Sequence, residues 1–173
     1  MDMSEGHYGV SLLNDCKYGH SALDGVMTLT LIKSGIEPNP TADQEEHTFT
    51  YALYPHAEGW RQANTVQEAM KLNQPLLSEE GGQAGCQNSF VWVDKSNVII
   101  ETVKMAEDDD GIIVRLYESE NAKTKAHIFF GEKISSVESC NCLEEIKQTI
   151  ETDGEGFEIT VKPYEIQTYR VRF

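Results

Sequence analysis

The sequence predicts an all-β fold, an antiparallel two-sheet β-sandwich with one short helix or crossover. In segments such as 25–33 and 48–54, apolar and polar residues alternate with the period of two that strands with distinct faces require. Roughly ten such short segments follow one another, separated by turn-forming residues. Because one stretch alone has helical spacing, few crossover helices are available to cover a parallel sheet.

Strands are expected first in the N-terminal third of the chain. Residues 8–14 form a short apolar run, and residues 25–33 and 48–54 alternate clearly. One face of the second segment carries Val26, Thr28, Thr30 and Ile32. Pro38 and Pro40 interrupt the chain before the third segment and mark a loop.

One segment, 58–73, has the spacing of a helix or of a partly helical crossover. The apolar residues that recur at roughly helical intervals are Trp60, Ala63, Val66, Ala69 and Met70. The helix is expected to end at Asn73, shortly before Pro75. The next residues, 78–88, are rich in Glu, Gly and Gln, which predicts a mobile surface loop.

Further strands are expected in the C-terminal half. The segments are 89–93, 98–106, 112–118, 125–131, 134–141, 157–162 and 164–173. The pair Asp110-Gly111 predicts a hairpin turn between two of them. Residues 143–150 fit either a helical turn or a broken strand. Trp92 lies in the middle of its strand and is expected to pack in the core.

The composition fits one folded domain over residues 1–173. Hydrophobic residues make up 39% of the chain, a share typical of a globular protein rather than of a disordered one. The formal net charge is −15, so the surface repels nucleic-acid phosphates and anionic membranes. The start of the chain is too polar for a signal peptide, and no apolar run is long enough to span a bilayer. These features predict a soluble, cytoplasmic protein without nucleic-acid or membrane partners.

The residues alone indicate neither a catalytic residue nor a metal site. The acidic run 107–110 is followed directly by Gly111, which favours a turn over a calcium loop. The four cysteines have no common zinc-binding spacing, so free, reduced thiols are expected; Cys140 and Cys142 would share a face if they lay on a strand. The five histidines include no His-x-x-x-His pair, and His56, at the end of a strand, is a candidate for lining a loop.

The most unusual segment is 14–20, where an apolar strand leads into residues that are almost all polar. Asn14 and Lys17 can donate hydrogen bonds, Asp15 can accept them, and Tyr18 offers an aromatic surface. Side chains of these kinds hold the hydroxyl groups and the faces of sugars.

The same segment has a purely structural interpretation. An Asx-type turn, with Gly19 at a positive φ, would also use these residue types. Cys16 and His20 lie close in sequence, but no third partner for a thiol nucleophile is visible. The residues themselves leave both interpretations open.

The segment 4–19, SEGHYGVSLLNDCKYG, closely resembles a stretch of the α-mannosidases of glycoside hydrolase family 38. Other segments are similar to that family in the same order, and they are 49–56, 89–94, 97–104, 113–118 and 162–166. The similarity spans nearly the whole chain, and 4–19 is its most specific part. Residues 81–86 depart from the family pattern within the expected loop.

The resemblance implies that residues 1–173 are the C-terminal β-sandwich domain of a larger enzyme that removes terminal α-linked mannose. Family members carry a catalytic domain and a helical domain before this region, and these domains are the implied partners. The family is zinc-dependent and retaining. Its zinc ligands and Asp nucleophile lie in the preceding domains and match no position here, so this chain is expected to hold no cofactor.

The resemblance also implies a role for the polar loop. In the family, the matching stretch approaches the active site from the β region, which makes Asn14, Asp15, Lys17 and Tyr18 candidate substrate-lining residues for a mannoside. The isolated chain is expected to be inactive.

Two other functions compete with this interpretation. An autonomous carbohydrate-binding module would need exposed aromatic residues, for which the candidates are Trp60, Trp92, Tyr18 and Tyr54. A self-contained hydrolase would need catalytic groups that the sequence does not indicate.

Overall fold

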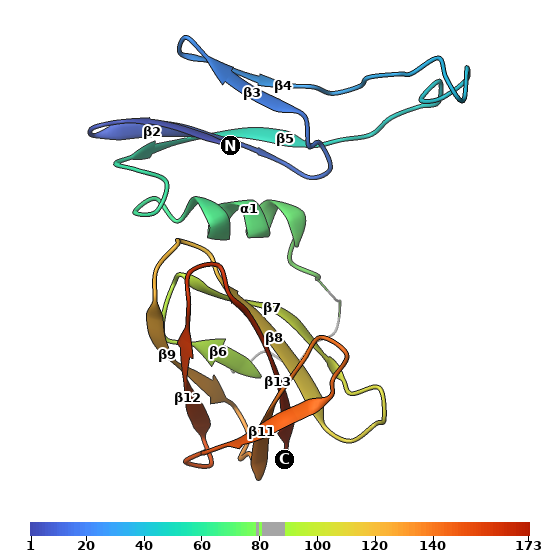
Figure 1. The fold of residues 1–173 in the computed structure, drawn as a ribbon. Coiled ribbons are helices and arrows are strands. Elements are labelled where there is room, and N and C mark those ends of the chain that lie inside the picture. Colours follow the sequence, from blue (N-terminus) through green and yellow to red (C-terminus); the bar gives the residue numbers. More distant parts are fainter. Residues whose placement is uncertain (79, 81–88) are drawn as a thin grey trace. The chain divides into compact units, whose positions relative to one another are not determined.

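The computed structural model describes residues 1–78, 80 and 89–173. The chain divides into two compact units, Met1–Glu80 (unit 1) and Gly81–Phe173 (unit 2) (Figure 1). Each unit is described by itself, and the single domain expected over residues 1–173 stays a prediction. In the described part of the chain, no helix is both long and apolar enough to cross a membrane.

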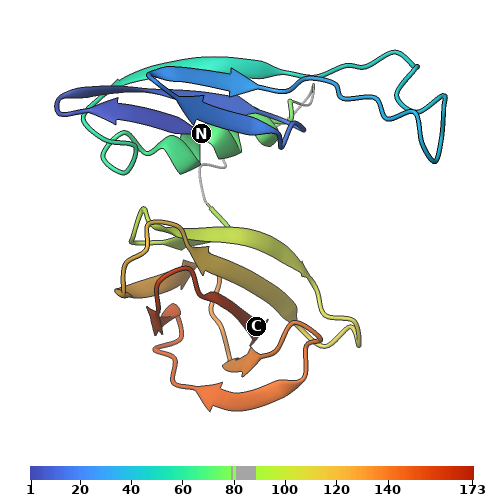
Figure 2. The same ribbon diagram turned by 45° about the horizontal axis from the view of Figure 1, so that its top comes forward.

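Unit 1 is built on a small antiparallel sheet. Its elements are β1 (Asp2–Glu5), β2 (Tyr8–Asn14), β3 (His20–Leu23), β4 (Val26–Leu29), β5 (Tyr51–Ala57) and α1 (Thr65–Asn73). Strands β1, β2 and β5 pair in that order, while β3 and β4 form a separate hairpin. Figures 1 and 2 show α1 along one side of the three-stranded sheet and the β3–β4 hairpin on the other.

The two faces of the unit 1 sheet have different surroundings. Ser11 on β2 pairs with Tyr54 on β5, and both side chains point toward α1, where Ser11 contacts Thr65 and the Tyr54 hydroxyl donates to Ala63 O at 3.0 Å. The opposite face is apolar and lies on the side of the β3–β4 hairpin, and on it Leu12 is buried whereas Leu53 is 67% exposed. One sheet face is thus covered by α1, and the other is only partly covered within unit 1.

Unit 2 is a two-sheet sandwich. Its strands are β6 (Val91–Val93), β7 (Val98–Met105), β8 (Ile112–Glu118), β9 (Thr124–Phe130), β10 (Ser136–Cys140), β11 (Ile146–Ile150), β12 (Gly156–Val161) and β13 (Ile166–Arg172). One sheet has the order β11-β10-β13-β8-β7 and the other β12-β9-β6, and the strand pairs within both are antiparallel. Alternate residues of both sheets meet in one hydrophobic core.

Aromatic rings fill the centre of this core. The rings of Phe157 on β12 and Tyr169 on β13 are 4.9 Å apart between centroids, and Phe130 on β9 lies against Phe157. Burial raises the pKa of Tyr169 to about 12, and its hydroxyl donates a hydrogen bond to Gln167 Oε1 at 2.7 Å. The phenol therefore stays neutral and partnered, as a buried hydroxyl requires.

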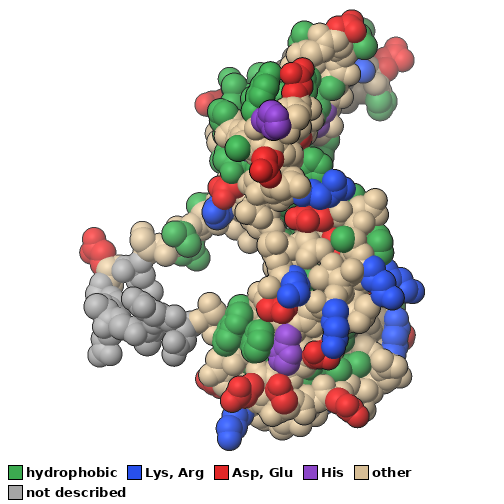
Figure 3. Space-filling view, turned by 90° about the vertical axis from the view of Figure 1, so that its left-hand side faces the viewer, with side chains coloured by type: hydrophobic (Ala, Val, Ile, Leu, Met, Phe, Trp, Pro, Cys, Tyr) green, Lys and Arg blue, Asp and Glu red, His purple; other side chains and the backbone are tan. Residues whose placement is uncertain are grey.

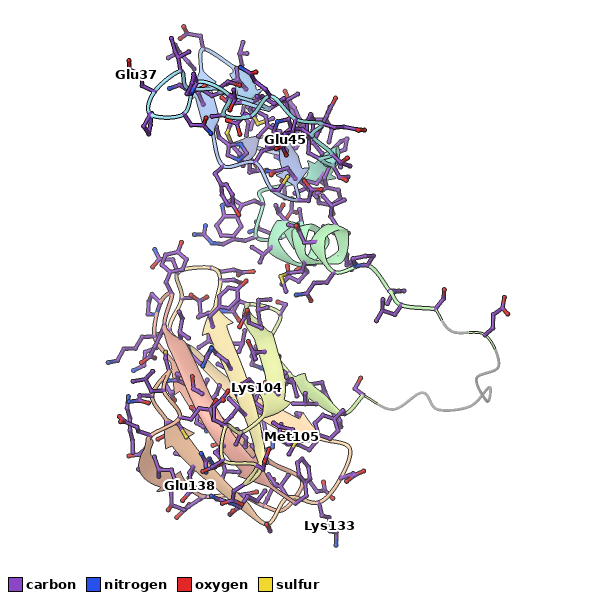
Figure 4. The ribbon with its side chains drawn as sticks, turned by 90° about the vertical axis from the view of Figure 1, so that its right-hand side faces the viewer. Glu37, Glu45, Lys104, Met105, Lys133 and Glu138 are labelled. Carbon is purple, nitrogen blue, oxygen red and sulfur yellow. The ribbon has the colours of Figure 1, made fainter. Side chains whose placement is uncertain are left out.

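Charged side chains fasten the β7–β8 hairpin to the neighbouring strands. Arg170 on β13 is almost fully buried and donates to Asp108 in the hairpin turn at 2.7 Å. Arg172 donates to Asp110 at 2.9 Å and, at 2.6 Å, to Glu138 on β10, which is labelled in Figure 4. The hydrogen bond from Arg172 holds the pKa of Asp110 below its usual range, so the carboxylate stays ionised beside the guanidinium.

The predicted fold class is confirmed, since the described residues form antiparallel sheets, among them the two-sheet sandwich of unit 2, and one short helix. The predicted Asp110-Gly111 turn does connect two antiparallel strands, β7 and β8. Residues 143–150, for which two alternatives were open, contain strand β11. The expected loop at 78–88 lies almost entirely outside the described residues.

Some element boundaries differ from the prediction. The helix begins at Thr65 rather than near residue 58, because residues 60–64 form turns. Strands β1 and β3 were not predicted, since they are short and too polar or exposed to show a clear alternation. The strand expected over 25–33 ends at Leu29.

The prediction that Trp92 packs in the core is wrong. Val91 and Val93 pack against the core, so the pleat sends the residue between them to the outer face. Trp92 is 42% exposed and stacks on Phe129 of β9. Large apolar residues on a strand do not by themselves reveal which face they occupy.

The stability of unit 2 should depend on the buried Leu116 and not on the exposed Leu143. Leu116 on β8 is 0% exposed and lies in the core, whereas Leu143 is 79% exposed. We expect Leu116→Ala to lower the free energy of unfolding by about 2–5 kcal/mol, through lost burial and a cavity. The matched change Leu143→Ala should alter it by less than about 0.5 kcal/mol. Urea unfolding followed by Trp92 fluorescence, in a Trp60→Phe background, measures both, and equal effects would contradict this core assignment.

Candidate functional site

The polar loop 14–19 begins where β2 ends, and its first two residues hold it in place. Asn14 Oδ1 accepts a hydrogen bond from the backbone N–H of Lys17 at 2.5 Å, which closes the turn. Asp15 Oδ2 accepts from the N–H of Thr50 at 2.8 Å, and the N–H of Asp15 donates to Thr50 O at 3.2 Å. The loop is therefore tied to the residues that lead into β5.

The protonation states in the loop do not suit thiol chemistry. A hydrogen bond with Cys16 and others from Thr50 hold the pKa of Asp15 below its usual range. The same hydrogen bond to Asp15 raises the pKa of the Cys16 thiol. A thiol that stays protonated at neutral pH is a poor nucleophile, so Cys16 is not a candidate for covalent catalysis.

Lys17 and Tyr18 project from the loop instead of holding it. The Lys17 ammonium lies 4.7 Å from the centroid of the Phe49 ring, a distance at which a cation is attracted to an aromatic face. The Tyr18 side chain is 91% exposed. Both residues are free to contact a ligand while their backbone is fixed by Asn14 and Asp15.

The turn of the structural interpretation is present, since Asn14 Oδ1 accepts from the N–H of Lys17, but Gly19 does not have the positive φ expected with it. Its constraint is steric: a Cβ atom at this position would lie 3.0 Å from the Cβ of Thr30. The N–H of Thr30 also donates to Gly19 O at 2.8 Å. This glycine allows the end of the loop to approach the segment that follows β4.

An open pocket of about 530 Å³ lies beside the loop. Residues 16–19 form one side and residues 30–33 another. The long connection between β4 and β5, on which Figure 4 labels Glu37 and Glu45, completes the lining with Asp43 and His47. The pocket thus combines an aromatic ring, ammonium groups, an imidazole and a carboxylate.

The four predicted substrate-lining residues are divided between two roles. Lys17 and Tyr18 line the pocket, whereas Asn14 and Asp15 form the turn that presents them. Sequence reasoning missed the contribution of residues 30–33, Asp43 and His47, because nothing in their local pattern shows that they approach the loop.

A second group of polar side chains lies between the sheet of unit 1 and α1. His56 Nε2 lies 2.7 Å from Asp2 Oδ2 and 3.3 Å from Ser11 Oγ. Ser11 Oγ donates to Asp2 Oδ2 at 2.7 Å and lies 2.9 Å from Thr65 Oγ1 at the start of α1. His56 was a candidate for lining a loop; its side chain instead joins β5 to β1 and β2, and Ser11 links this group to Thr65 of α1.

These side chains are of the types found in a serine hydrolase, but their arrangement is different. In a catalytic triad the acid and the hydroxyl contact different nitrogens of the imidazole. Here Asp2 and Ser11 both contact Nε2 of His56, and the Ser11 proton is donated to Asp2. His56 cannot act as the base for Ser11 in this geometry, and the group has a structural role.

Metal binding finds no support in the part of the chain that the structure describes. No group of three or more His, Cys, Asp or Glu side chains there is placed to hold a metal ion. Zinc, which the family resemblance associates with a preceding catalytic domain, therefore has no fitting site among the described residues.

The fold and the loop correspond to a known class of domain, the C-terminal β region of a glycoside hydrolase. Residues 97–169 match the family model described as "Glycosyl hydrolases family 38 C-terminal beta sandwich domain". Residues 1–41, which include the polar loop, match "Glycosyl hydrolases family 38 C-terminal domain". The chain belongs to glycoside hydrolase family 38, within the C-terminal region of its members.

The similar curated proteins are much longer than this chain. It is 34% identical to "Alpha-mannosidase G" of Dictyostelium discoideum over 98% of the chain and 16% of that protein. It is 35% identical to "Alpha-mannosidase 2C1" of Homo sapiens over 83% of the chain and 14% of that protein. The chain thus spans about one sixth of the length of these relatives.

Solved structures agree on the fold. The crystal structure of an alpha-mannosidase from Enterococcus faecalis superposes on 98% of this chain with a TM-score of 0.73, and the match covers 20% of that structure. The sequence identity is 21%, so this similarity concerns the fold alone.

The contact between His56 and Asp2 should make the stability of unit 1 depend on pH. The hydrogen bond to Asp2 raises the pKa of His56 above 6.5, although burial acts in the opposite direction. The stabilisation of unit 1 by protonated His56 is therefore complete below about pH 6.5. It is lost as the pH rises through the pKa of His56 in the folded state. Burial raises the pKa of Asp2, but hydrogen bonds from Ser4, Ser11 and His56 hold it below 3.8, so its contribution is lost in acid.

We expect the unfolding free energy of unit 1 to fall as the pH rises from 6 to 9, and His56→Gln to remove most of this dependence. Trp60 fluorescence in a Trp92→Phe background measures unfolding of this unit. His7→Gln, a change at an exposed histidine, is the control and should keep the wild-type profile. A pH profile unchanged by His56→Gln would refute the proposed contact.

Proposed function

We propose that this chain is the non-catalytic C-terminal domain of an α-mannosidase that hydrolyses terminal α-linked mannose, and that its loop 14–19 forms part of the substrate pocket. The observation that carries the proposal is the position of Lys17 and Tyr18. Both line an open pocket, and both lie in the segment that matches the family. The relatives, named alpha-mannosidases, support the reaction.

The loop residues contribute binding and orientation rather than bond cleavage. The exposed Tyr18 ring offers an apolar face to the C–H groups of a sugar, while the Lys17 ammonium donates hydrogen bonds to hydroxyl groups. Asp15 and Asn14 keep the backbone of this loop in position. The paired carboxylates of glycoside hydrolysis and the family's zinc belong, in this proposal, to other parts of the enzyme.

The proposal includes the rest of the enzyme as a partner, because unit 1 covers one face of its sheet only partly. Met3, Tyr8, Val10, Leu12 and Leu53 line an apolar pocket together with Val26 and Met27 of the β3–β4 hairpin. Tyr8 and Val26 are mostly exposed. Open apolar surfaces of this kind mark contact sites, and relatives some six times longer supply the chain that would cover it.

A cytoplasmic location is part of the same proposal. The described cysteines, Cys16, Cys140 and Cys142, are free thiols. Free thiols, some of them exposed, fit a reducing compartment better than an oxidising one.

An autonomous carbohydrate-binding module remains the second candidate, and the exposure of Trp92 favours it. Trp92 belongs to unit 2, far in sequence from loop 14–19, and it does not line the pocket proposed for the mannoside.

The pocket role of Tyr18 can be tested in the full-length enzyme. Tyr18→Ala should lower kcat/KM for an aryl α-mannoside by about tenfold, since loss of a sugar–ring contact costs on the order of 1 kcal/mol. Lys17→Ala should act in the same direction. Tyr164→Ala, which removes another exposed tyrosine on unit 2, should leave kcat/KM unchanged. Activity insensitive to both loop changes would refute the substrate-lining role.

The 173-residue chain by itself should show no turnover of the same aryl α-mannoside, because the proposed catalytic groups lie elsewhere. The full-length enzyme, assayed in parallel, is the positive control. Turnover that purifies with the isolated chain and is lost on mutation of that chain would show a self-contained hydrolase instead.

A further inference from the structure

The outer face of the β12-β9-β6 sheet carries a row of flat rings. Strand pairing places Trp92 of β6 beside Phe129 of β9, and Phe129 beside Gly156 of β12. His127 follows on the same face of β9, two residues before Phe129. Ile128 lies in the core, and Val91 and Val93 on either side of Trp92 pack against it. The pleat therefore turns the rings of Trp92, Phe129 and His127 outward.

The rings contact one another in sequence across the sheet. The centroids of Trp92 and Phe129 are 5.4 Å apart with the ring planes 11° from parallel. The Phe129 and His127 centroids are 4.2 Å apart. Phe129 stacks on one face of the indole, and Trp92 as a whole is 42% exposed.

A glycine makes room for this row. A Cβ atom on Gly156 would lie 2.6 Å from His127 Nε2 and 2.1 Å from Ile128 O, so no larger residue fits without moving the imidazole or the backbone. The His127 ring therefore lies over β12 and extends the row to that edge of the sheet. Figure 3 shows hydrophobic, imidazole and acidic side chains close together on one face of the sandwich.

The row of rings ends at a polar groove of about 510 Å³. His127 lines this groove with residues 149–153, Phe157 and Glu158. Two backbone N–H groups, from Glu155 and Gly156, hold the pKa of Asp153 below its usual range, so its carboxylate is ionised. These bonds use Asp153 Oδ1, while Oδ2 lies 3.8 Å from His127 Nε2.

The groove offers hydrogen-bond acceptors next to an aromatic surface. Glu151 and Glu158 are exposed, Glu158 Oε2 lies 2.7 Å from the Lys125 ammonium, and Thr149 adds a hydroxyl group. Carboxylates repel anionic ligands, and the chain as a whole carries a net charge of −15. Among the described residues no cluster is suited to a metal ion. A neutral, polyhydroxylated ligand with flat apolar C–H faces matches what remains.

We propose that the Trp92–Phe129–His127 row and the adjoining groove bind the sugar rings of a neutral glycan, at a site separate from the pocket of loop 14–19. The aromatic row contacts the C–H faces of the sugar, and Glu151, Asp153 and Glu158 accept hydrogen bonds from its hydroxyl groups. The site lies wholly in unit 2, so it does not depend on the loop pocket being a substrate site.

Binding can be tested with the 173-residue chain and soluble mannan, with dextran as a second neutral glycan. In a Trp60→Phe background, Trp92 is the sole tryptophan, and mannan or dextran should change its fluorescence in a saturable way. Affinity electrophoresis in gels that contain the polymer should show retarded migration. Trp92→Ala should weaken binding about tenfold, and Glu151→Gln combined with Glu158→Gln should weaken it in the same assay.

Tyr164→Ala serves as the control, because it removes an exposed aromatic residue of unit 2 that does not line the groove, and it should bind mannan as the unmodified chain does. Tyr18→Ala, which removes the ring of the unit 1 pocket, separates the two sites: the Trp92 fluorescence change should persist in this variant. Far-UV circular dichroism should show that all variants are folded. If Trp92→Ala does not fold, the fluorescence titration of the Trp60→Phe chain decides alone.

Three results would overturn the proposal. The first is the absence of binding to both polymers. The second is binding that folded Trp92→Ala leaves unchanged, or that Tyr18→Ala abolishes, since the glycan would then bind elsewhere. The third is a Trp92 fluorescence change produced by spermidine and not by either glycan, which would identify a cation site.

Discussion

The pairing of β9 with β6 on one side and β12 on the other determines which side chains of this sheet enter the core of unit 2 and which lie on its outer face. It sends Ala126, Ile128 and Phe130 into the core and leaves His127 and Phe129 on the outer face. The buried side chains hold the two sheets together through apolar contact, which is the main source of stability in such a sandwich. The outer rings are a consequence of the same pleat, and they are held in position by a core to which they do not contribute.

In unit 1, the two faces of the β1-β2-β5 sheet are covered to different extents. Its sheet is covered on one face by α1, and the buried contacts of Asp2, Ser11, His56 and Thr65 join the two. The other face keeps an apolar surface open beneath the β3–β4 hairpin. A sheet that buries one face within its own unit leaves the other face, and the loop that follows β2, available for the contacts proposed above.

The family assignment and the site proposals rest on different observations. Membership in glycoside hydrolase family 38 follows from similarity over two segments, one in each unit. The role of loop 14–19 rests on geometry, because Asn14 and Asp15 fix the turn while Lys17 and Tyr18 remain available. The glycan surface on unit 2 rests on its own residues, so either site proposal can fail without the other.

The sequence by itself determined the all-β class, the sandwich, the short helix and the Asp110-Gly111 turn, because alternation and turn chemistry are local properties of the chain. It also identified loop 14–19 as unusual. Only the tertiary structure decided that Trp92 points outward, that Gly19 serves a close approach to Thr30, and that His56 meets Asp2. Each of these depends on contacts between segments distant in sequence. The alternation along a strand predicts that its two faces differ, but it does not identify which face is buried.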